Sequence, residues 1–261
     1  MDPILFQIGP LTVRYYGLLM ALAFLAGYFI FRRISKKEMS GNETDVYFIY
    51  MIIGLTAGAR LGQVIFYDPL FYLKYPLEIL AIWHGGLASH GAFIGGIIAT
   101  IIFCRRHKKR FYRIADLIVV PVALGAAFVR IGNFINGEIV GRVANAHLPW
   151  AMKFDGYEGL RHPVQIYEAI MNVGVFCILL LLRKVKRLPE GLVSWSFVLV
   201  YSFLRFFLEF FKEYEGIVGP WSFLTMGQYL CAAFFIVSAI MMWVKYRHFL
   251  GKIYKSGFHN K

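Results

Sequence analysis

The sequence is short of acidic residues and cysteines. It holds 15 Asp and Glu against 28 Lys and Arg among its 261 residues, so the formal net charge is +13. The three cysteines, Cys104, Cys177 and Cys231, fall in apolar stretches and form no CxxC pair. This pattern indicates neither a disulfide framework nor a zinc site, and we predict no metal site.

Several forms of organisation are also absent. The sequence contains no linker, low-complexity run, fixed-period repeat or P-loop. We therefore expect a single domain over residues 1–261 that carries no nucleotide-binding motif.

Hydrophobic residues are abundant. They make up 59% of the chain, aromatic residues make up 18%, and the mean hydropathy is +0.59, which is too apolar for an ordinary soluble domain. Apolar windows of about 20 residues, the length that a helix needs to cross a bilayer, recur along the chain. We predict an all-α integral membrane protein with about seven transmembrane helices. The predicted helices cover residues 15–32, 46–66, 85–104, 114–133, 164–182, 191–211 and 223–244.

The connections between these helices differ in charge. Most Lys and Arg follow the first, third, fifth and seventh helices, within residues 32–37, 105–113, 183–187 and 245–261. The positive-inside rule then places the N-terminus outside and the C-terminus in the cytoplasm. Because the charges follow the first apolar stretch, that stretch is expected to be a spanning anchor rather than a cleavable signal peptide. Topology and anionic lipid account for the positive charge, so no nucleic acid partner is expected.

Two outer loops and a set of glycines have predicted structural roles. Residues 134–163 are expected to fold as a small outer-face cap, and residues 68–84, rich in aromatic and aliphatic side chains, to lie in the membrane interface. Gly54, Gly58 and Gly62 recur every four positions and predict close packing of the second helix on a neighbour.

Three arginines, Arg60, Arg130 and Arg205, fall inside predicted helices. An ionisable side chain at membrane depth costs roughly 2.5 to 3.5 kcal/mol on insertion scales, so it usually faces a cavity or a partner. The planar guanidinium fork suits phosphate and carboxylate. A cluster of these arginines would favour an anionic, lipid-borne ligand.

The polar run RIGNFINGEIVGR covers residues 130–142, where the fourth predicted helix leaves the bilayer. It combines three glycines with polar side chains, which are Arg130, Asn133, Asn136, Glu138 and Arg142. Glycine permits non-helical backbone, and such backbone at membrane depth must be covered by protein or line a cavity. The run therefore favours a functional site over a plain helix end.

A second group lies on the sixth predicted helix. Tyr201, Arg205 and Glu209 are spaced by four residues and share one face. The alternative interpretation is a structural ion pair between Arg205 and Glu209. Glu168 is expected to be buried with an arginine partner that the sequence does not identify, and Asp116 to cap its own helix or balance charge.

Two histidines and a tyrosine complete the candidates. His90 is a candidate general base, because histidine titrates near neutrality, although a structural role is an equal alternative. His84 is the weaker candidate of the two. Tyr16 could donate a hydroxyl hydrogen bond or belong to the aromatic belt of the membrane interface.

Six motifs then occur along the chain in a fixed order. They are YYGLLM from Tyr15, AGARLGQVIFY at 57–67, WHGGLASHGA at 83–92, RIGNFINGEIVGR at 130–142, RHPVQIYE at 161–168 and MGQ at 226–228. Together with the Tyr201, Arg205 and Glu209 face, they resemble the bacterial prolipoprotein diacylglyceryl transferases. Ala92, where the family commonly has glycine, and Lys212, where it often has arginine, depart from the pattern.

The resemblance implies an enzyme of the bacterial cytoplasmic (inner) membrane, with its active site toward the outer face. It would transfer the sn-1,2-diacylglyceryl group of phosphatidylglycerol to the lipobox cysteine of a preprolipoprotein, giving a thioether and glycerol 1-phosphate in the first step of lipoprotein maturation. The matched positions are Tyr16, His90, Arg130, Asn133, Glu138, Gly141, Tyr201, Arg205 and Glu209.

For that reaction we expect catalytic roles for His90, Arg130, Tyr201 and Arg205. The two arginines would hold the phosphate, and His90 would take the thiol proton unless water or another group does so. Head-group binding would involve Arg130 again and five further residues, which are Tyr16, Asn133, Glu138, Gly141 and Glu209. No cofactor is expected, because the phosphodiester is itself the activated donor.

Two rival functions remain at this point. A transporter or flippase for anionic lipids would also place arginines in a lipid-accessible cavity, but the sequence shows no inverted repeat or paired broken helices. A membrane scaffold without catalytic function would pair its polar residues and bind nothing.

Overall fold

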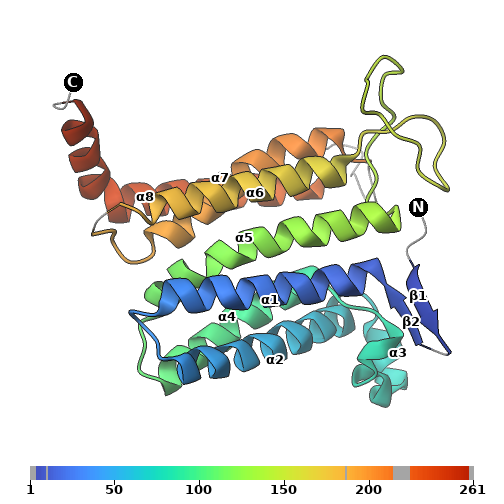
Figure 1. Ribbon diagram of the computed structural model, residues 1–261, viewed down its shortest axis with the longest axis horizontal. Coiled ribbons are helices and arrows are strands. Elements are labelled where there is room, and N and C mark those ends of the chain that lie inside the picture. Colours follow the sequence, from blue (N-terminus) through green and yellow to red (C-terminus); the bar gives the residue numbers. More distant parts are fainter. Residues whose placement is uncertain (1–3, 10, 186, 214–223, 259–261) are drawn as a thin grey trace. The chain divides into compact units, whose positions relative to one another are not determined.

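The computed structural model describes residues 4–9, 11–185, 187–213 and 224–258. These residues are mostly helical and contain almost no sheet, which confirms the predicted all-α membrane fold (Figure 1). The long helices are α1 (Tyr15–Ser35), α2 (Gly41–Phe66), α4 (Ser89–Arg106), α5 (Phe111–Asn136), α6 (Val164–Leu182), α7 (Leu192–Leu208) and α8 (Met226–Phe258). The short helices are α3 (Pro69–Lys74), η1 (Pro76–Ile79), η2 (Ile82–His84) and η3 (Glu209–Phe211).

Each of the seven apolar stretches forms a helix, and six of the described helices are long and apolar enough to cross a membrane. These six indicate a multi-pass membrane protein. The seventh, α4, is not among them, because His90, Arg105 and Arg106 lower the mean hydropathy of its 18 residues. The count of seven spans and the orientation of the termini therefore stay predictions.

A two-stranded hairpin precedes α1, which the sequence analysis did not predict. Strand β1 (Ile4–Ile8) pairs antiparallel with β2 (Leu11–Arg14), with Ile8 opposite Leu11. The hairpin leads directly into α1 and so places Tyr16 in the first turn of that helix.

The contacts divide the chain into two compact units. One comprises Met1–Ile30 and Asp116–Lys261, and the other comprises Phe31–Ala115. The single domain over residues 1–261 stays a prediction.

Helices α2 and α4 form the centre of the unit Phe31–Ala115 and pack side by side (Figure 1). A Cβ atom added at Gly62 would lie 2.8 Å from the Cα of Gly91, and one added at Gly58 would lie 2.8 Å from the Cα of Gly95. Only glycine allows backbones to approach so closely, which confirms the predicted packing role of these residues.

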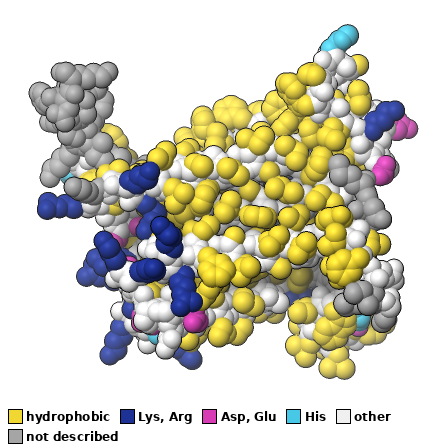
Figure 2. Space-filling view, viewed as in Figure 1, with side chains coloured by type: hydrophobic (Ala, Val, Ile, Leu, Met, Phe, Trp, Pro, Cys, Tyr) yellow, Lys and Arg dark blue, Asp and Glu magenta, His cyan; other side chains and the backbone are white. Residues whose placement is uncertain are grey.

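Charged contacts stabilise the connection that precedes α2 and the connection that follows α4. Ser40 and Glu43 form a capping box at the start of α2, and Glu43 also pairs with Lys109 at 2.8 Å. Arg113 pairs with Glu38 at 3.0 Å. Figure 2 shows Lys and Arg side chains gathered over these connections, whereas hydrophobic side chains cover the flanks of the helices.

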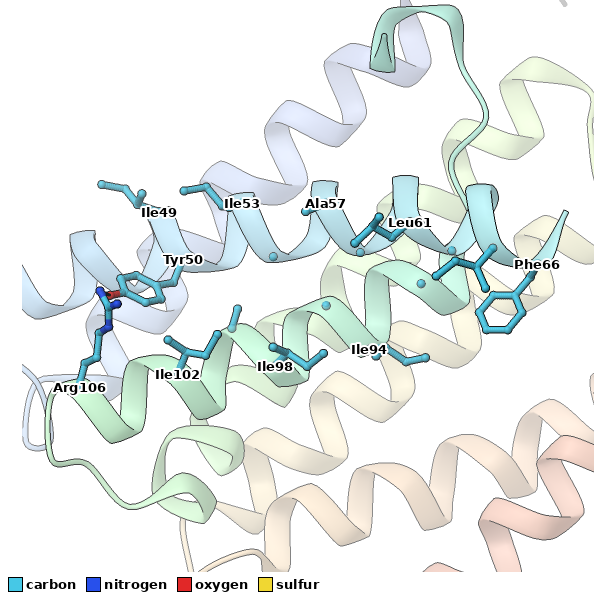
Figure 3. A pocket seen from close by; sticks show the side chains of 17 residues that line it. Ile49, Tyr50, Ile53, Ala57, Leu61, Phe66, Ile94, Ile98, Ile102 and Arg106 are labelled. Atoms are coloured by element: carbon cyan, nitrogen blue, oxygen red, sulfur yellow. Dashed lines mark hydrogen bonds between the residues drawn. The ribbon is translucent and has the colours of Figure 1, made fainter. Parts of the chain in front are cut away.

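A groove of about 620 Å³ runs between α2 and α4 (Figure 3). Isoleucines such as Ile53 and Ile98 line it, and Arg106 stands at one end, where its Nη1 donates a hydrogen bond to the Tyr50 hydroxyl at 3.3 Å. Arg106 and the Tyr50 hydroxyl are the only charged or hydroxyl groups of the lining, which is otherwise formed by apolar side chains and glycines.

Candidate functional site

The centre of the candidate site is a buried carboxylate between two arginines. Glu168 on α6 is 1% exposed, and its side chain forms ion pairs with Nε of Arg130 on α5 and, at 3.3 Å, with Nε of Arg205 on α7. The carboxylate oxygens lie at ion-pair distance without hydrogen-bond geometry, so charge is what holds the three groups together. The sequence predicted an arginine partner for Glu168, and the structure supplies two.

A second carboxylate extends this group. Glu209 forms an ion pair with Nη1 of Arg205 four residues earlier, and its Oε1 accepts a hydrogen bond from the Thr225 hydroxyl at 3.0 Å. A Cβ atom added at Gly227 would lie 2.7 Å from Glu209 Oε1. This close approach explains why a glycine occupies the first turn of α8, a role that the sequence did not reveal.

These four side chains, Arg130, Glu168, Arg205 and Glu209, are called the arginine–glutamate cluster below. Their formal charges cancel, which lowers the cost of burying them together. The exposed fractions of the two arginine side chains are 23% for Arg130 and 12% for Arg205, so Arg130 is the more accessible. Because each guanidinium has five N–H donors, both can still receive a phosphate oxygen.

The polar run 130–142 surrounds the Arg130 side of the cluster. Arg130 donates to Asn133 Oδ1 at 3.3 Å, and Asn133 Nδ2 donates to Glu138 Oε1 at 2.9 Å. Asn136 Nδ2 donates to the same oxygen at 3.2 Å. Glu138 thus contacts Arg130 through Asn133, and its role in head-group binding stays a prediction. The chain turns at Gly137, whose φ of +70° favours glycine.

Gly141 lies where three backbone segments meet. Its N–H donates to the carbonyl of His162 at 3.2 Å, and the neighbouring Arg142 N–H donates to Phe211 at 2.9 Å. A Cβ atom at position 141 would lie 2.8 Å from the Phe211 carbonyl oxygen. The structure therefore gives Gly141 a packing function within the loop, and its assignment to head-group binding stays a prediction.

Two tyrosines stand near the cluster. The Tyr16 ring faces Gly132, where an added Cβ atom would lie 2.7 Å from Tyr16 Cδ2, and its hydroxyl lies near the charged groups of Arg130 and Glu138. Tyr201 lies one turn before Arg205 on α7, and its hydroxyl lies near the charged groups of Arg130 and Arg205. The structure thus brings Tyr16, Tyr201 and the arginines into one site.

His90 lies in the other unit, in the first turn of α4, with an exposed side chain. The start of this helix is tied to α2, because the Ala88 N–H donates to the Ala59 carbonyl at 3.0 Å. Its role as general base stays a prediction. His84 pairs with Glu78, with 2.8 Å between Nδ1 and Oε2.

Arg60 departs from the expectation of an anion-binding residue. It is 4% exposed, and all its N–H groups point at backbone carbonyls of residues 78–86. Because those donors are used, Arg60 is not available to a phosphate.

Of the two roles expected for Asp116, the cap of its own helix was wrong, and the balance of charge stays a prediction. Its carboxylate accepts from the N–H groups of Gly191 at 2.6 Å and Ser194 at 2.8 Å. It therefore caps α7 rather than α5, where a negative charge also complements the helix dipole.

No group of three or more His, Cys, Asp and Glu side chains is arranged to hold a metal ion within the part of the chain that the structure describes. The arginine–glutamate cluster offers two guanidinium groups and two carboxylates, and the phenols of Tyr16 and Tyr201 lie near it. Such a set can bind an anion and stabilise charge that develops on it.

Comparisons with known proteins identify a family and its relatives. A family model described as prolipoprotein diacylglyceryl transferase matches residues 3–244. A relative from Dechloromonas aromatica (strain RCB), named phosphatidylglycerol–prolipoprotein diacylglyceryl transferase, is 38% identical over 252 residues, which cover 94% of this chain and 96% of the relative. A relative of the same name from Oleidesulfovibrio alaskensis (strain ATCC BAA-1058 / DSM 17464 / G20) is 40% identical over 236 residues, 88% of each chain.

Proposed function

Because the chain belongs to the prolipoprotein diacylglyceryl transferase family, we propose that it transfers the diacylglyceryl group of phosphatidylglycerol to a preprolipoprotein. The acceptor is the thiol of the lipobox cysteine, and the products are a thioether-linked lipid and glycerol 1-phosphate. The observation that carries this proposal is the placement of Arg130 and Arg205 on either side of Glu168. Two guanidinium groups beside a shared carboxylate suit a substrate whose reacting group is a phosphodiester.

The reaction exchanges one bond at the glyceryl carbon. The thiol loses its proton, and the thiolate attacks the carbon that carries the phosphodiester oxygen. A carbon–sulfur bond forms as the carbon–oxygen bond breaks, and the electron pair of the broken bond leaves with the phosphate oxygen. The phosphate thereby gains negative charge in the transition state. No cofactor is required, because the phosphate is the leaving group.

Arg130 and Arg205 stabilise that growing charge. Their buried surroundings strengthen the interaction relative to water, and the two ion pairs with Glu168 set their positions before the substrate arrives. Glu209 holds Arg205 from its other side. As the phosphate gains charge, the arginine donors interact with it more strongly than with the phosphodiester of the bound lipid, which is what accelerates the reaction.

The remaining residues orient the substrates. Tyr16 and Tyr201 direct hydroxyl groups at the head group, and Asn133 with Glu138 keeps Arg130 in place. Gly141 allows the loop to close around the site. His90 accepts the thiol proton. The site faces the outer side of the bacterial cytoplasmic membrane, where preprolipoproteins present their lipobox.

A reconstituted reaction tests this proposal. The purified protein is incubated with phosphatidylglycerol and a lipobox peptide, the peptide mass is measured, and glycerol phosphate release is followed. We expect a diacylglyceryl mass at the cysteine and equimolar glycerol phosphate, both lost in Arg130→Ala. Arg142→Ala is the matched control, since Arg142 belongs to the same run but donates to the Lys212 carbonyl outside the cluster.

An unmodified peptide in the presence of folded protein would contradict the proposal. Movement of labelled phosphatidylglycerol between liposome leaflets under the same conditions would then favour a lipid transporter.

A further inference from the structure

The starting observation is that one buried arginine saturates its hydrogen bonds with a single stretch of backbone. A guanidinium carries five N–H donors. In Arg60 on α2, Nε donates to one carbonyl, and Nη1 and Nη2 each donate to two. The acceptors are the carbonyls of Glu78, Ile79, Ala81, Gly85 and Gly86, with distances of 3.1 Å to Ile79, 3.0 Å to Gly86 and 3.0 Å to Ala81.

Two of these carbonyls also accept hydrogen bonds within the segment, Glu78 from the Ala81 N–H at 3.1 Å and Ala81 from the His84 N–H at 3.2 Å, whereas those of Ile79, Gly85 and Gly86 have no backbone donor among the described residues. Residues 76–84 form only the single turns η1 and η2, and Gly85 and Gly86 have φ values of +84° and +70°, outside any regular helix. Carbonyls at the end of a helical turn have no N–H donor within the turn, so they normally accept hydrogen bonds from water. In the absence of water they must bond to protein.

The outward side of the same segment is strongly apolar. Five large hydrophobic residues of the segment are each 72% to 83% exposed. They are Leu70, Leu73, Leu77, Leu80 and Trp83. Figure 2 shows hydrophobic side chains gathered over the α3 region. A contiguous apolar surface of this kind marks a protein or membrane contact, and tryptophan is enriched at the membrane interface.

The position of the segment identifies lipid as the contact. It begins at Pro69, three residues after α2 ends at Phe66, and α2 is one of the helices able to cross a membrane. The last residues of α2, Ile65 and Phe66, are also exposed and apolar, so the surface of the segment continues the lipid-facing surface of the helix. The charged groups of the segment are few and suit the interface, since Glu78 pairs with His84 and Lys74 lies over the Tyr75 ring.

We propose that residues 69–87 are embedded among the phospholipid acyl chains at the membrane surface where α2 ends, and that Arg60 makes this possible by replacing water at the backbone carbonyls. The ring of Tyr72, 5.0 Å from the Arg60 Cζ atom, covers the guanidinium within the same segment. Arg60 is thus a positioning residue for a lipid-embedded loop. The proposal depends on the membrane-spanning fold and is independent of the transferase activity.

Cysteine labelling in nanodiscs tests the embedding. The native cysteines are replaced by alanine, and Leu77→Cys, Leu80→Cys and Ala146→Cys are compared in nanodiscs of phosphatidylglycerol and phosphatidylethanolamine. The probe is a charged, membrane-impermeant maleimide. Leu77 and Leu80 are 83% and 72% exposed in the protein itself, so only lipid can shield them. Ala146, in the long loop, is exposed and serves as the control.

We expect positions 77 and 80 to react at least about tenfold more slowly than position 146, because the charged reagent does not enter the acyl region. Reaction at all three positions at similar rates would overturn the embedding.

Arg60→Lys tests the role of the arginine. Lysine keeps the charge but donates from a single atom, so it cannot reach five carbonyls. We expect the rate at Leu80→Cys to rise at least about tenfold in Arg60→Lys, as water follows the freed carbonyls into the segment. Unchanged slow labelling would overturn the role of Arg60.

A second measurement separates a local effect from unfolding. Cys104 on α4 is 4% exposed and belongs to the same unit, so in a protein with Cys104 as its only cysteine it should stay unreactive after Arg60→Lys. Reaction at Cys104 as well would overturn the proposed local role, because Arg60 would then hold the whole unit together.

Discussion

Nε of Arg205 on α7 lies 3.3 Å from Oε1 of Glu168 on α6, and the same carboxylate pairs with Arg130 on α5. Three helices therefore meet at one buried charge. This contact sets the distance between the two guanidinium groups that we assign to the phosphate, so Glu168 is a positioning residue for both.

Glu168→Gln preserves the shape of the side chain and removes its charge. We expect kcat to fall by about 100-fold, because small displacements of positioned groups have effects of that order. KM for phosphatidylglycerol should stay the same or decrease, since the cluster would gain one net positive charge. Loss of a buried ion partner should also lower the free energy of unfolding by roughly 3 kcal/mol.

Steady-state kinetics with varied phosphatidylglycerol and a thermal melt measure both effects. Glu158→Gln, which neutralises an exposed loop carboxylate, is the control and should leave both unchanged. A large rise in KM with normal kcat would show that Glu168 serves substrate binding alone.

Gly227→Ala places a methyl group against Glu209, because the added Cβ atom would lie 2.7 Å from Oε1. We expect Glu209 to shift away from Arg205, with a loss of about tenfold in kcat/KM and roughly 1 to 3 kcal/mol in stability from overpacking. Gly174→Ala on α6 is the matched control, since no atom lies within 4 Å of its added Cβ. Equal behaviour of the two variants would argue against a constrained Glu209.

His90→Gln tests the proposed general base. Removing a general base commonly costs 10²- to 10⁴-fold in rate, and we expect turnover to fall within about that range while KM for phosphatidylglycerol changes little. His84→Gln removes an exposed histidine that pairs with Glu78 and should keep near-normal turnover. If His90→Gln also kept near-normal turnover, water or another group would be the base.

The long loop should lose stability in acid through His162. Burial lowers the pKa of His162 below its ordinary value, because the charged imidazolium is poorly solvated there. The folded state therefore binds fewer protons than the unfolded state. The stabilising contribution of the neutral ring is present above the unfolded pKa and is lost as the pH falls through the folded pKa.

We expect the unfolding temperature to decrease between pH 7 and pH 5 by more in the wild type than in His162→Gln, which cannot titrate. His147→Gln, at an exposed loop position, is the control. An identical pH dependence in the wild type and His162→Gln would exclude this histidine as the cause.

The sequence by itself determined the membrane fold, because apolar length is a local property that a window of about 20 residues contains completely. It also determined which residues share a helix face, so the pairing of Arg205 with Glu209 and the packing of Gly58 and Gly62 could be predicted from spacing. The resemblance to a family then indicated the site residues and the reaction.

Only the tertiary structure decided which distant groups meet. Glu168 could have paired with any intramembrane arginine, and helix packing selected Arg130 and Arg205 together. The sequence did not distinguish Arg60 from Arg130 and Arg205, since all three fall inside predicted helices. The hydrogen-bond partners of Arg60 are nevertheless carbonyls 18 to 26 residues further along the chain. A side chain shows its chemistry in the sequence, but its partner depends on how the helices and loops approach one another, because long-range contacts form only when the chain has folded.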